Sequence, residues 1–459
     1  MQNINFPLPL NAEITRRKKE KLIGAIGTMK LLKQGVWLYF ILLIFEGALR
    51  KWFLPALSSP LLIVRDPIAL GIIWLAWKRG LLVLNPNIIA IWIVTAISIL
   101  FSMIFGHKSA AVAFFGARVF LFHFPLIYAI GRIFDRDDVI QLGKITLWIA
   151  VPMVVLIATQ FYSPQSAWVN RGVGGSEEGA GFSGALGYFR PPGTFSFTNG
   201  NGMFFGFVGA YVLYFWLNPG KVNKLLLVTA TLAVLASISL SISRTLFFEL
   251  LVSLGFAMIA ICFKPKYIGR MLIAVLGMVI AMALLSQTEF FQTATEAFLH
   301  RFETANEIEG GLEGVLGDRY MGGMLGAIAG VPVKIPLVGF GIGMGTNVGA
   351  MLLTGDVVFL ISEEEWGRLI GEMGAPLGIS IIFIRLKLCW QLTMACFSRL
   401  RMGDLLPWML LSFCLLCIPQ GQWGQPTALG FGTLIAGLVI ASLRVPRTKK
   451  QNFSIQTKS

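Results

Sequence analysis

The chain contains 459 residues, of which 56% are hydrophobic and 13% are charged, and its mean hydropathy is +0.74. Because soluble domains carry roughly 25% charged residues, this composition excludes a water-soluble globular protein. The formal net charge of +15 does not indicate nucleic-acid binding either, because the basic residues cluster in short segments between apolar runs, as they do in membrane proteins.

Apolar runs long enough to cross about 30 Å of hydrocarbon recur along nearly the whole chain. They predict an all-α polytopic membrane protein with about twelve transmembrane helices. The runs lie near 35–49, 61–77, 81–105, 110–131, 141–161, 199–217, 224–242, 245–263, 269–287, 366–386, 404–419 and 427–443.

The distribution of Lys and Arg residues predicts how these helices are oriented. Placing the N-terminus in the cytoplasm puts most of the basic residues in cytoplasmic segments, as the positive-inside rule requires. On this topology the basic segments 1–34 and 444–459 are both cytoplasmic. Helices 1 to 9 occupy 35–287 and helices 10 to 12 occupy 366–443.

Two long loops are expected outside the cytoplasm. The first, 162–198, is rich in glycine, and the second, 288–365, separates helices 9 and 10 and begins with a helical-looking sequence. Loops of this length in compact proteins are usually functional or disordered. On the cytoplasmic side, 387–403 mixes aromatic with basic residues and is expected to lie along the lipid surface.

Charged side chains within transmembrane helices are rare and costly, so each is a candidate functional residue. In the predicted spans they are Glu46, Arg65, Asp66, Arg118, His123, Arg244 and Glu249. Only His123 is expected near the midplane, where transporters place ionisable groups. Basic groups near the outer surface favour an anionic ligand. The alternative is that these residues are paired or snorkel at helix ends, as the i,i+4 spacing of Glu46 and Arg50 allows.

A loop-to-helix junction at 190–202 has the sequence of an anion site. It begins with Arg190 and reaches a predicted helix start at Thr198 or Asn199, either of which could cap that helix. Helix N-termini bind anions through their exposed N–H groups. Richness in Gly, Pro and Asn is also typical of any turn.

Two other motifs are weaker signals. The glycine run Gly339–Gly345 lacks the strand–turn–helix context and the downstream acidic residue that dinucleotide binding requires. The D-x-D at Asp135–Asp137 lies in a short cytoplasmic loop with no domain to hold a nucleotide, and is interpreted as a solvated charge cluster. No spacing of residues predicts a metal site or a bound cofactor.

Four segments occur in a characteristic order along the chain. They are Arg190-Pro-Pro-Gly-Thr-Phe with Thr198-Asn199, Ser243-Arg244, Arg319 with Pro336-Leu-Val-Gly-Phe-Gly-Ile-Gly343, and Trp366 with Glu372-Met-Gly374-Ala-Pro-Leu-Gly378. Together they resemble the motifs of the O-antigen ligase and polymerase superfamily of bacterial envelope glycosyltransferases. The likeness covers about residues 140–390, and the large loop between helices 9 and 10 also resembles that family.

The resemblance implies a multi-pass protein of the bacterial inner membrane that acts at its outer face. A glycan on an undecaprenyl-diphosphate carrier would be transferred to a hydroxyl group of a glycan or lipid-glycan acceptor, without a nucleotide sugar or another cofactor. Arg190, Arg244 and Arg319 would bind the diphosphate and stabilise the leaving group, with Asn199 at the same site. Membrane lipids surround the protein, and a flippase and a chain-length regulator are candidate partners.

One position departs from the family. Its ligases have a histidine where this chain has Glu363, which is followed by Glu364 and Glu365. Glu363 could act as the general base, or the run could be a solvated acidic turn. The missing histidine favours a polymerase that joins repeat units over a ligase that uses a different acceptor. A polysaccharide flippase or other transporter is the alternative from another class, although no internal repeat of the transporter kind is visible.

Overall fold

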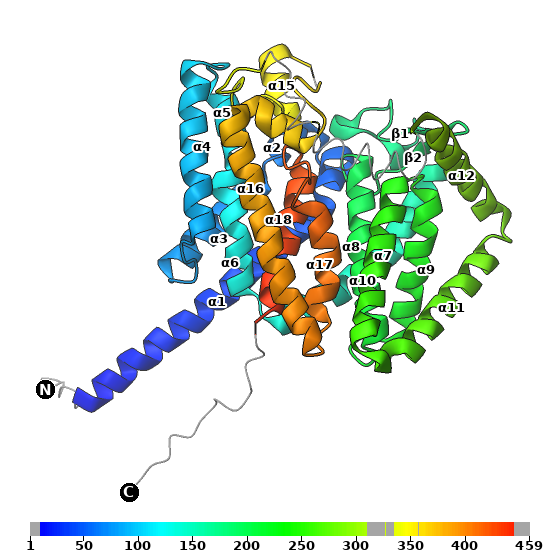
Figure 1. Cartoon of the computed structure of the whole chain (residues 1–459), viewed down its shortest axis with the longest axis horizontal. Coiled ribbons are helices and arrows are strands. Elements are labelled where there is room, and N and C mark those ends of the chain that lie inside the picture. Colours follow the sequence, from blue (N-terminus) through cyan, green and yellow to red (C-terminus); the bar gives the residue numbers. More distant parts are fainter. Residues whose placement is uncertain (1–9, 310–325, 327–334, 357, 445–459) are drawn as a thin grey trace, which may run out of the picture.

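The computed structural model describes residues 10–309, 326, 335–356 and 358–444. Within these ranges the chain is a helical bundle with one small antiparallel sheet (Figure 1). The helices are α1 (Leu10–Ala48), α2 (Ser58–Leu61), α3 (Arg65–Lys78), α4 (Pro86–Ile104), α5 (Ala110–Arg118), α6 (Phe124–Ile133), α7 (Arg136–Tyr162), α8 (Thr198–Leu217), α9 (Lys224–Leu240), α10 (Arg244–Phe263), α11 (Ile268–Leu285), α12 (Glu289–Glu309), α15 (Asn347–Thr354), α16 (Glu365–Arg401), α17 (Leu406–Cys417) and α18 (Pro426–Ser442).

Nine helical segments in the described part of the chain are long and apolar enough to cross a membrane, so the chain is a multi-pass membrane protein. Three further apolar helices, α9, α17 and α18, are shorter. Each coincides with one of the predicted spans. The exact number of membrane crossings remains a prediction.

Several helices begin at polar side chains that satisfy their first N–H groups. Asn85 accepts from Ile88 N at the start of α4, and Ser243 accepts from Leu246 N at the start of α10. Asp135 and Asp138 form a reciprocal capping box on α7. These caps begin helices immediately after short turns, which is why the closely spaced apolar runs at 224–242 and 245–263 fold as separate helices.

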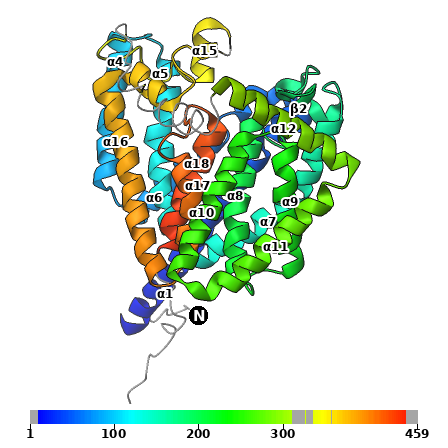
Figure 2. The same ribbon diagram turned by 45° about the vertical axis from the view of Figure 1, so that its right-hand side comes forward.

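The bundle has a buried centre and a lipid-exposed edge. Helix α8 lies at the centre, where it packs against α7, α9, α10 and α17, and 83% of its most apolar stretch is buried. The corresponding share for α11 is 11%, which places that helix at the edge (Figures 1 and 2). On the other side α18 packs against α6 and α17, and α16 packs against α4 and α17.

The elements formed by the two long predicted loops gather at one end of the bundle, which we call the loop end. The hairpin β1 (Phe182–Ala185) and β2 (Tyr188–Arg190), α12 and α15 all lie there, opposite the end from which the N-terminal part of α1 extends (Figures 1 and 2). The described parts of 162–198 and 288–365 thus lie at the same end of the bundle. The hairpin itself is an addition to the all-α prediction.

One prediction about the other end is wrong. The segment 387–403 does not form a separate surface helix, because α16 continues without interruption through it to Arg401. Its apolar face explains the difference: Cys389, Leu392, Cys396 and Leu400 are buried. Spaced three to four residues apart, these side chains pack against the bundle and leave Lys387 and Arg401 exposed.

Candidate functional site

A buried non-helical segment connects α17 to α18 at the loop end. Helix α17 has 12 residues, too few to cross about 30 Å of hydrocarbon. The connecting residues 418–425 return into the bundle, and Ile418 and Trp423 are 0% and 1% exposed. Within a membrane, non-helical backbone is tolerated only where it is buried in protein or lines a water-filled cavity.

Arg385, from the middle of α16, satisfies this segment. Its Nε donates to the carbonyl of Ile418 at 2.7 Å, and its Nη2 donates to the carbonyl of Gly421 at 2.8 Å. The guanidinium also lies 4.0 Å from the ring centroid of Trp423. Arg385 is 0% exposed, so it acts as an internal brace for the 418–425 segment.

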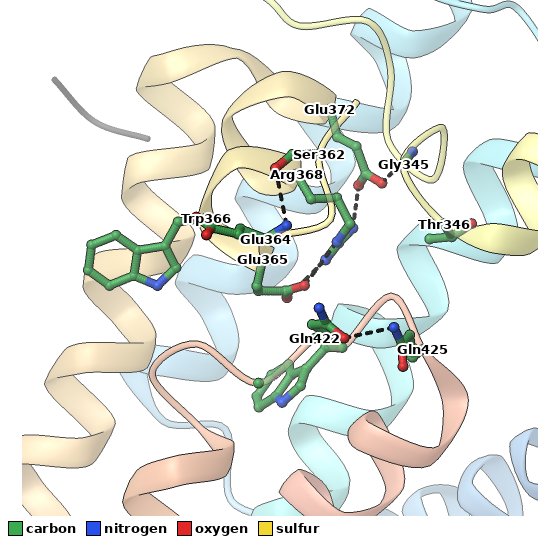
Figure 3. A network of polar contacts seen from close by, with 12 residues as sticks. Gly345, Thr346, Ser362, Glu364, Glu365, Trp366, Arg368, Glu372, Gln422 and Gln425 are labelled. Carbon is green, nitrogen blue, oxygen red and sulfur yellow. Dashed lines mark hydrogen bonds and ion pairs between the residues drawn. The ribbon is translucent and has the colours of Figure 1, made fainter. Parts of the chain in front are cut away.

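The same arginine belongs to a buried network of Glu365, Arg368, Glu372 and Arg385, all on α16, which we call the arginine–glutamate network. Arg385 contacts Glu365 at 2.6 Å. Arg368 bridges Glu365 at 2.9 Å and Glu372 at 2.7 Å (Figure 3). Two carboxylates and two guanidinium groups balance in formal charge. Burial of these groups is therefore compensated within the network.

The network also fixes the glycine-rich run Gly339–Gly345, which lies in the second half of the large predicted loop 288–365. Glu372 accepts a hydrogen bond from Gly345 N at 2.9 Å (Figure 3). At Gly374 the helix α16 is interrupted by a left-handed backbone conformation, with φ of 76°. A Cβ atom at Gly339 would lie 2.4 Å from Gly374 N, so this backbone contact requires glycine. The run Gly339–Gly345 thus serves backbone packing.

A polar pocket lies between this loop, the start of α16 and the 418–425 segment. Its lining includes Asn347, Phe359, Glu363, Arg368, Gln422 and Gln425. The enclosed volume is about 10 Å³, roughly the space of one water-sized group. Glu363, the predicted general base, lines this pocket but is itself exposed, as is Glu364, whereas Glu365 is buried. The interpretation as a solvated acidic turn therefore fits Glu363 and Glu364 but not Glu365.

A chain of three amide side chains joins this pocket to the start of α8. Asn199 donates to Gln425 Oε1 at 2.9 Å. Gln425 in turn donates to Gln422 Oε1 at 2.7 Å (Figure 3). Gln422 then donates to the backbone carbonyl of Glu363 at 2.9 Å. We call Asn199, Gln425 and Gln422 the amide chain. Two predicted site residues that are far apart in sequence, Asn199 and Glu363, are connected through it.

The expected cap of α8 is absent. The helix begins at Thr198, and Phe197 occupies the N-cap position without a side-chain cap. Neither Thr198 nor Asn199 caps it, because both residues lie inside the first turn and Asn199 is used by Gln425.

Arg190 and Arg244 lie on neighbouring segments of the loop end. Arg190 ends β2 and lies over the ring of Phe182, 4.6 Å from its centroid. The hairpin packs on the α9–α10 turn, since a Cβ atom at Gly184 would lie 2.7 Å from Ile242 Cδ1. Arg244 begins α10 two residues later. The third predicted arginine, Arg319, lies outside the described residues.

A second group of buried charges lies where α1, α3 and α5 meet, and we call it the buried charge cluster. Four of its members are basic and two are acidic: Arg50, Lys51, Arg65, Arg118, Glu46 and Asp66. Glu46 contacts Arg65 at 3.0 Å and Arg50 at 3.7 Å, and both oxygens of Asp66 accept from Arg118 at 2.8 Å. The paired interpretation therefore applies to both carboxylates, with Arg65 as the closer partner of Glu46.

His123 extends this cluster toward the centre of the bundle. Its Nε2 lies 2.9 Å from Asp66 Oδ1, and its Nδ1 lies 3.0 Å from the Tyr39 hydroxyl. A π-helical segment, Val119–His123, interrupts α5 and α6 at this point. Such insertions rotate side chains out of the regular helical phase, and this one places Arg118 and His123 on the same carboxylate.

The basic members of the cluster hold the loop that leads from Arg190 to Asn199. Lys51 Nζ donates to the carbonyl of Gly193 at 2.7 Å, and Arg50 donates to Ser196 Oγ at 2.9 Å. The Thr194 hydroxyl donates to the carbonyl of Ile44 at 2.6 Å. The cluster thus fixes the backbone of the predicted anion-binding junction against α1.

Sequence reasoning missed Arg368, Arg385, Gln422 and Gln425. The arginines lie within or beside a predicted span, and the rule that intramembrane charges are costly would have selected Arg385. The glutamines lie in Pro-Gln-Gly-Gln-Trp-Gly-Gln-Pro at 419–426. This polar insertion after an unusually short apolar run was the available signal for a buried non-helical segment.

Glu249 remains apart from these groups. It faces α8, where a Cβ atom at Gly206 would lie 2.1 Å from its Oε2, and it is 9% exposed. Among the described residues its Oε2 has no hydrogen-bond partner.

Comparisons with protein-family models, with curated proteins and with solved structures found no match to this chain.

Proposed function

We propose that this multi-pass membrane protein is a glycosyltransferase that extends lipid-linked oligosaccharides at the outer face of the bacterial inner membrane. The donor would be an oligosaccharide repeat unit on an undecaprenyl-diphosphate carrier. The acceptor would be a hydroxyl group on a second, growing glycan. The proposal combines the motif resemblance with the arrangement of the loop end.

The observation that carries the proposal is the amide chain. It connects Asn199, which follows the predicted diphosphate-binding junction, to Glu363, the predicted base. A transferase needs its donor and acceptor groups held in one site, because fixed orientation supplies much of the rate enhancement. The 418–425 segment, braced by Arg385, provides a rigid support for both.

The proposed reaction is a displacement at the anomeric carbon of the donor sugar. The acceptor oxygen forms a new bond to that carbon while the bond from the carbon to the phosphate oxygen breaks. Glu363 takes the proton of the acceptor hydroxyl. Arg190, Arg244 and Arg319 stabilise the negative charge that develops on the diphosphate leaving group.

Two charge distributions support this assignment of roles. The buried charge cluster has two more basic than acidic side chains and holds the Arg190–Asn199 junction, which suits an anionic group. The charged residues that line the pocket are Glu363, Glu365 and Arg368, with one net negative formal charge. The pocket is therefore unsuited to a diphosphate and suited to the acceptor side.

One structural feature favours the transporter alternative. Transporters place substrates at interrupted helices, and α16 is interrupted at Gly374. At this interruption, however, the carbonyls of Gly371 and Glu372 already accept hydrogen bonds from Phe340 N and Gly341 N of the glycine loop. The carbonyl groups freed by the interruption are therefore already hydrogen-bonded within the protein, which favours a rigid site over a transport gate.

The test is a reconstituted assay with the purified protein in liposomes and undecaprenyl-diphosphate-linked repeat units. We expect longer lipid-linked glycans and release of undecaprenyl diphosphate. Transfer of a single unit to a different acceptor would favour the O-antigen-type ligase. Movement across the bilayer without covalent change would favour the flippase. Neither extension nor transfer with any acceptor would reject the proposal.

A further inference from the structure

The polar pocket contains side chains of two kinds. Those of its floor are fully engaged: Arg368 contacts Glu365 and Glu372, while Gln422 and Gln425 belong to the amide chain. These contacts make the floor rigid. Because the charged and polar groups of the floor are already paired with one another, they are not available to pair with a charged ligand.

Three lining residues have side chains that form no hydrogen bond, ion pair or ring contact within the described residues. The side chains of Asn347 and Glu363 form neither hydrogen bonds nor ion pairs there, and the ring of Phe359 contacts no other aromatic ring. Phe359 is 48% exposed, and Glu363 is exposed as well. An exposed aromatic ring beside uncommitted polar groups is typical of a ligand-binding site.

These groups have complementary chemistry. An amide both donates and accepts hydrogen bonds, whereas an ionised carboxylate only accepts them. A phosphate group, which also only accepts, would find one donor in Asn347 and repulsion from Glu363. A sugar offers hydroxyl groups that donate to the carboxylate and exchange bonds with the amide, and a C–H face that can lie on the aromatic ring.

The size of the pocket sets how a sugar would enter. The enclosed volume of about 10 Å³ has room for roughly one oxygen-sized group. A whole sugar ring therefore stays at the rim, against Phe359, while a single hydroxyl group points inward. This geometry selects one hydroxyl of the ring.

We infer that the pocket of Asn347, Phe359 and Glu363 is a subsite for the terminal neutral sugar of the acceptor glycan. The inference rests on the proposed function and deepens it. Asn347 and Phe359 determine acceptor affinity, and Glu363 receives the proton of the inserted hydroxyl group. The donor diphosphate binds elsewhere, at the Arg190–Asn199 junction.

A binding experiment tests this subsite without requiring catalysis. The protein in lipid nanodiscs is titrated with the water-soluble repeat-unit oligosaccharide, cut from its lipid by mild acid, and separately with inorganic diphosphate. We expect Asn347→Ala and Phe359→Ala each to weaken oligosaccharide binding about tenfold, which corresponds to roughly one lost hydrogen bond or ring contact. Diphosphate binding should be unchanged. Leu352→Ala, an exposed change on the same helix as Asn347, is the control.

The outcomes separate this inference from the proposed function. Oligosaccharide binding that depends on Asn347 and Phe359 in a protein without transferase activity would support the subsite and reject the function. Extension activity with oligosaccharide binding unaffected by either change would overturn the subsite alone. Failure of the wild-type protein to bind the oligosaccharide, or equal loss of diphosphate binding in both variants, would also overturn it. Glu363→Gln should retain binding and lose transfer.

Discussion

Replacing Arg385 by methionine removes the brace of the 418–425 segment while keeping a long apolar stem. The carbonyls of Ile418 and Gly421 lose their donors, at a cost of about 1–3 kcal/mol each. Breaking a buried ion pair costs about 3–5 kcal/mol, and the low end applies because Arg368 still contacts Glu365. Taking the low end of each range gives a loss of about 5 kcal/mol in the local stability of this segment.

Cysteine labelling measures this loss directly. Cys417, at the end of α17, is 2% exposed and should react with a maleimide only when the adjacent segment opens. A loss of about 5 kcal/mol should raise its labelling rate by roughly three to four orders of magnitude, since each 1.4 kcal/mol is tenfold. Mass spectrometry distinguishes Cys417 from the exposed Cys262.

The matched control is Lys387→Met, which removes an exposed cation from the same helix two residues later. Its Cys417 labelling should equal that of the wild type. Arg385→Lys should recover only part of the protection, because an ammonium group cannot reproduce the fork of donors. Wild-type protection of Cys417 in Arg385→Met would refute the assigned role of Arg385.

Three further predictions follow from the buried contacts. Gly430→Ala should lower the unfolding temperature, because a Cβ atom there would lie 1.9 Å from Arg65 Nη1. Such overpacking costs about 1–3 kcal/mol. Gly71→Ala is the control and should leave the unfolding temperature unchanged, because a Cβ atom at Gly71 would have nothing within 4 Å. Asp66→Asn should destabilise the protein by about 3–5 kcal/mol, because Arg118 loses its carboxylate partner. Combining it with Arg118→Met should lower the free energy of unfolding by less than the sum of the two single changes. A double-mutant cycle of unfolding measures this difference. Arg244→Ala and Arg319→Ala should each abolish polymer formation in the liposome assay while membrane insertion stays intact, with little recovery by lysine. Arg171→Ala, at an arginine whose side chain is 39% exposed, should retain polymer formation. Full activity of both the Arg244 and the Arg319 alanine variants would remove these arginines from the site.

The helices could be predicted from the sequence because each depends on a local pattern. The apolar runs located the long apolar helices of the described residues, and the helical-looking start of the 288–365 loop forms α12. The error at 387–403 arose because aromatic and basic residues also occur on a buried helix whose charged face is exposed. The same periodic pattern of apolar residues suits a helix that packs against other helices and a helix that lies on a lipid surface, so periodicity alone does not distinguish the two.

The candidate site could be predicted only in part, because its contacts join residues far apart in sequence. Arg190, Asn199, Arg244 and Glu363 were selected by motif, and the structure places them at the loop end. The partner of Asn199 is Gln425, a relation between residues 226 positions apart that no local pattern encodes. The role expected for Asn199, a helix cap, was wrong for the same reason.

The central claim is that a diphosphate-linked donor binds at the loop end of the bundle. Photocrosslinking tests it directly: an undecaprenyl-diphosphate analogue with a diazirine close to the diphosphate is irradiated with the protein in nanodiscs, and the modified peptides are identified by mass spectrometry. We predict labelling of peptides that contain Arg190, Asn199 or Arg244, which an excess of inorganic diphosphate prevents. Labelling confined to the opposite end of the bundle, or insensitive to diphosphate, would contradict the account.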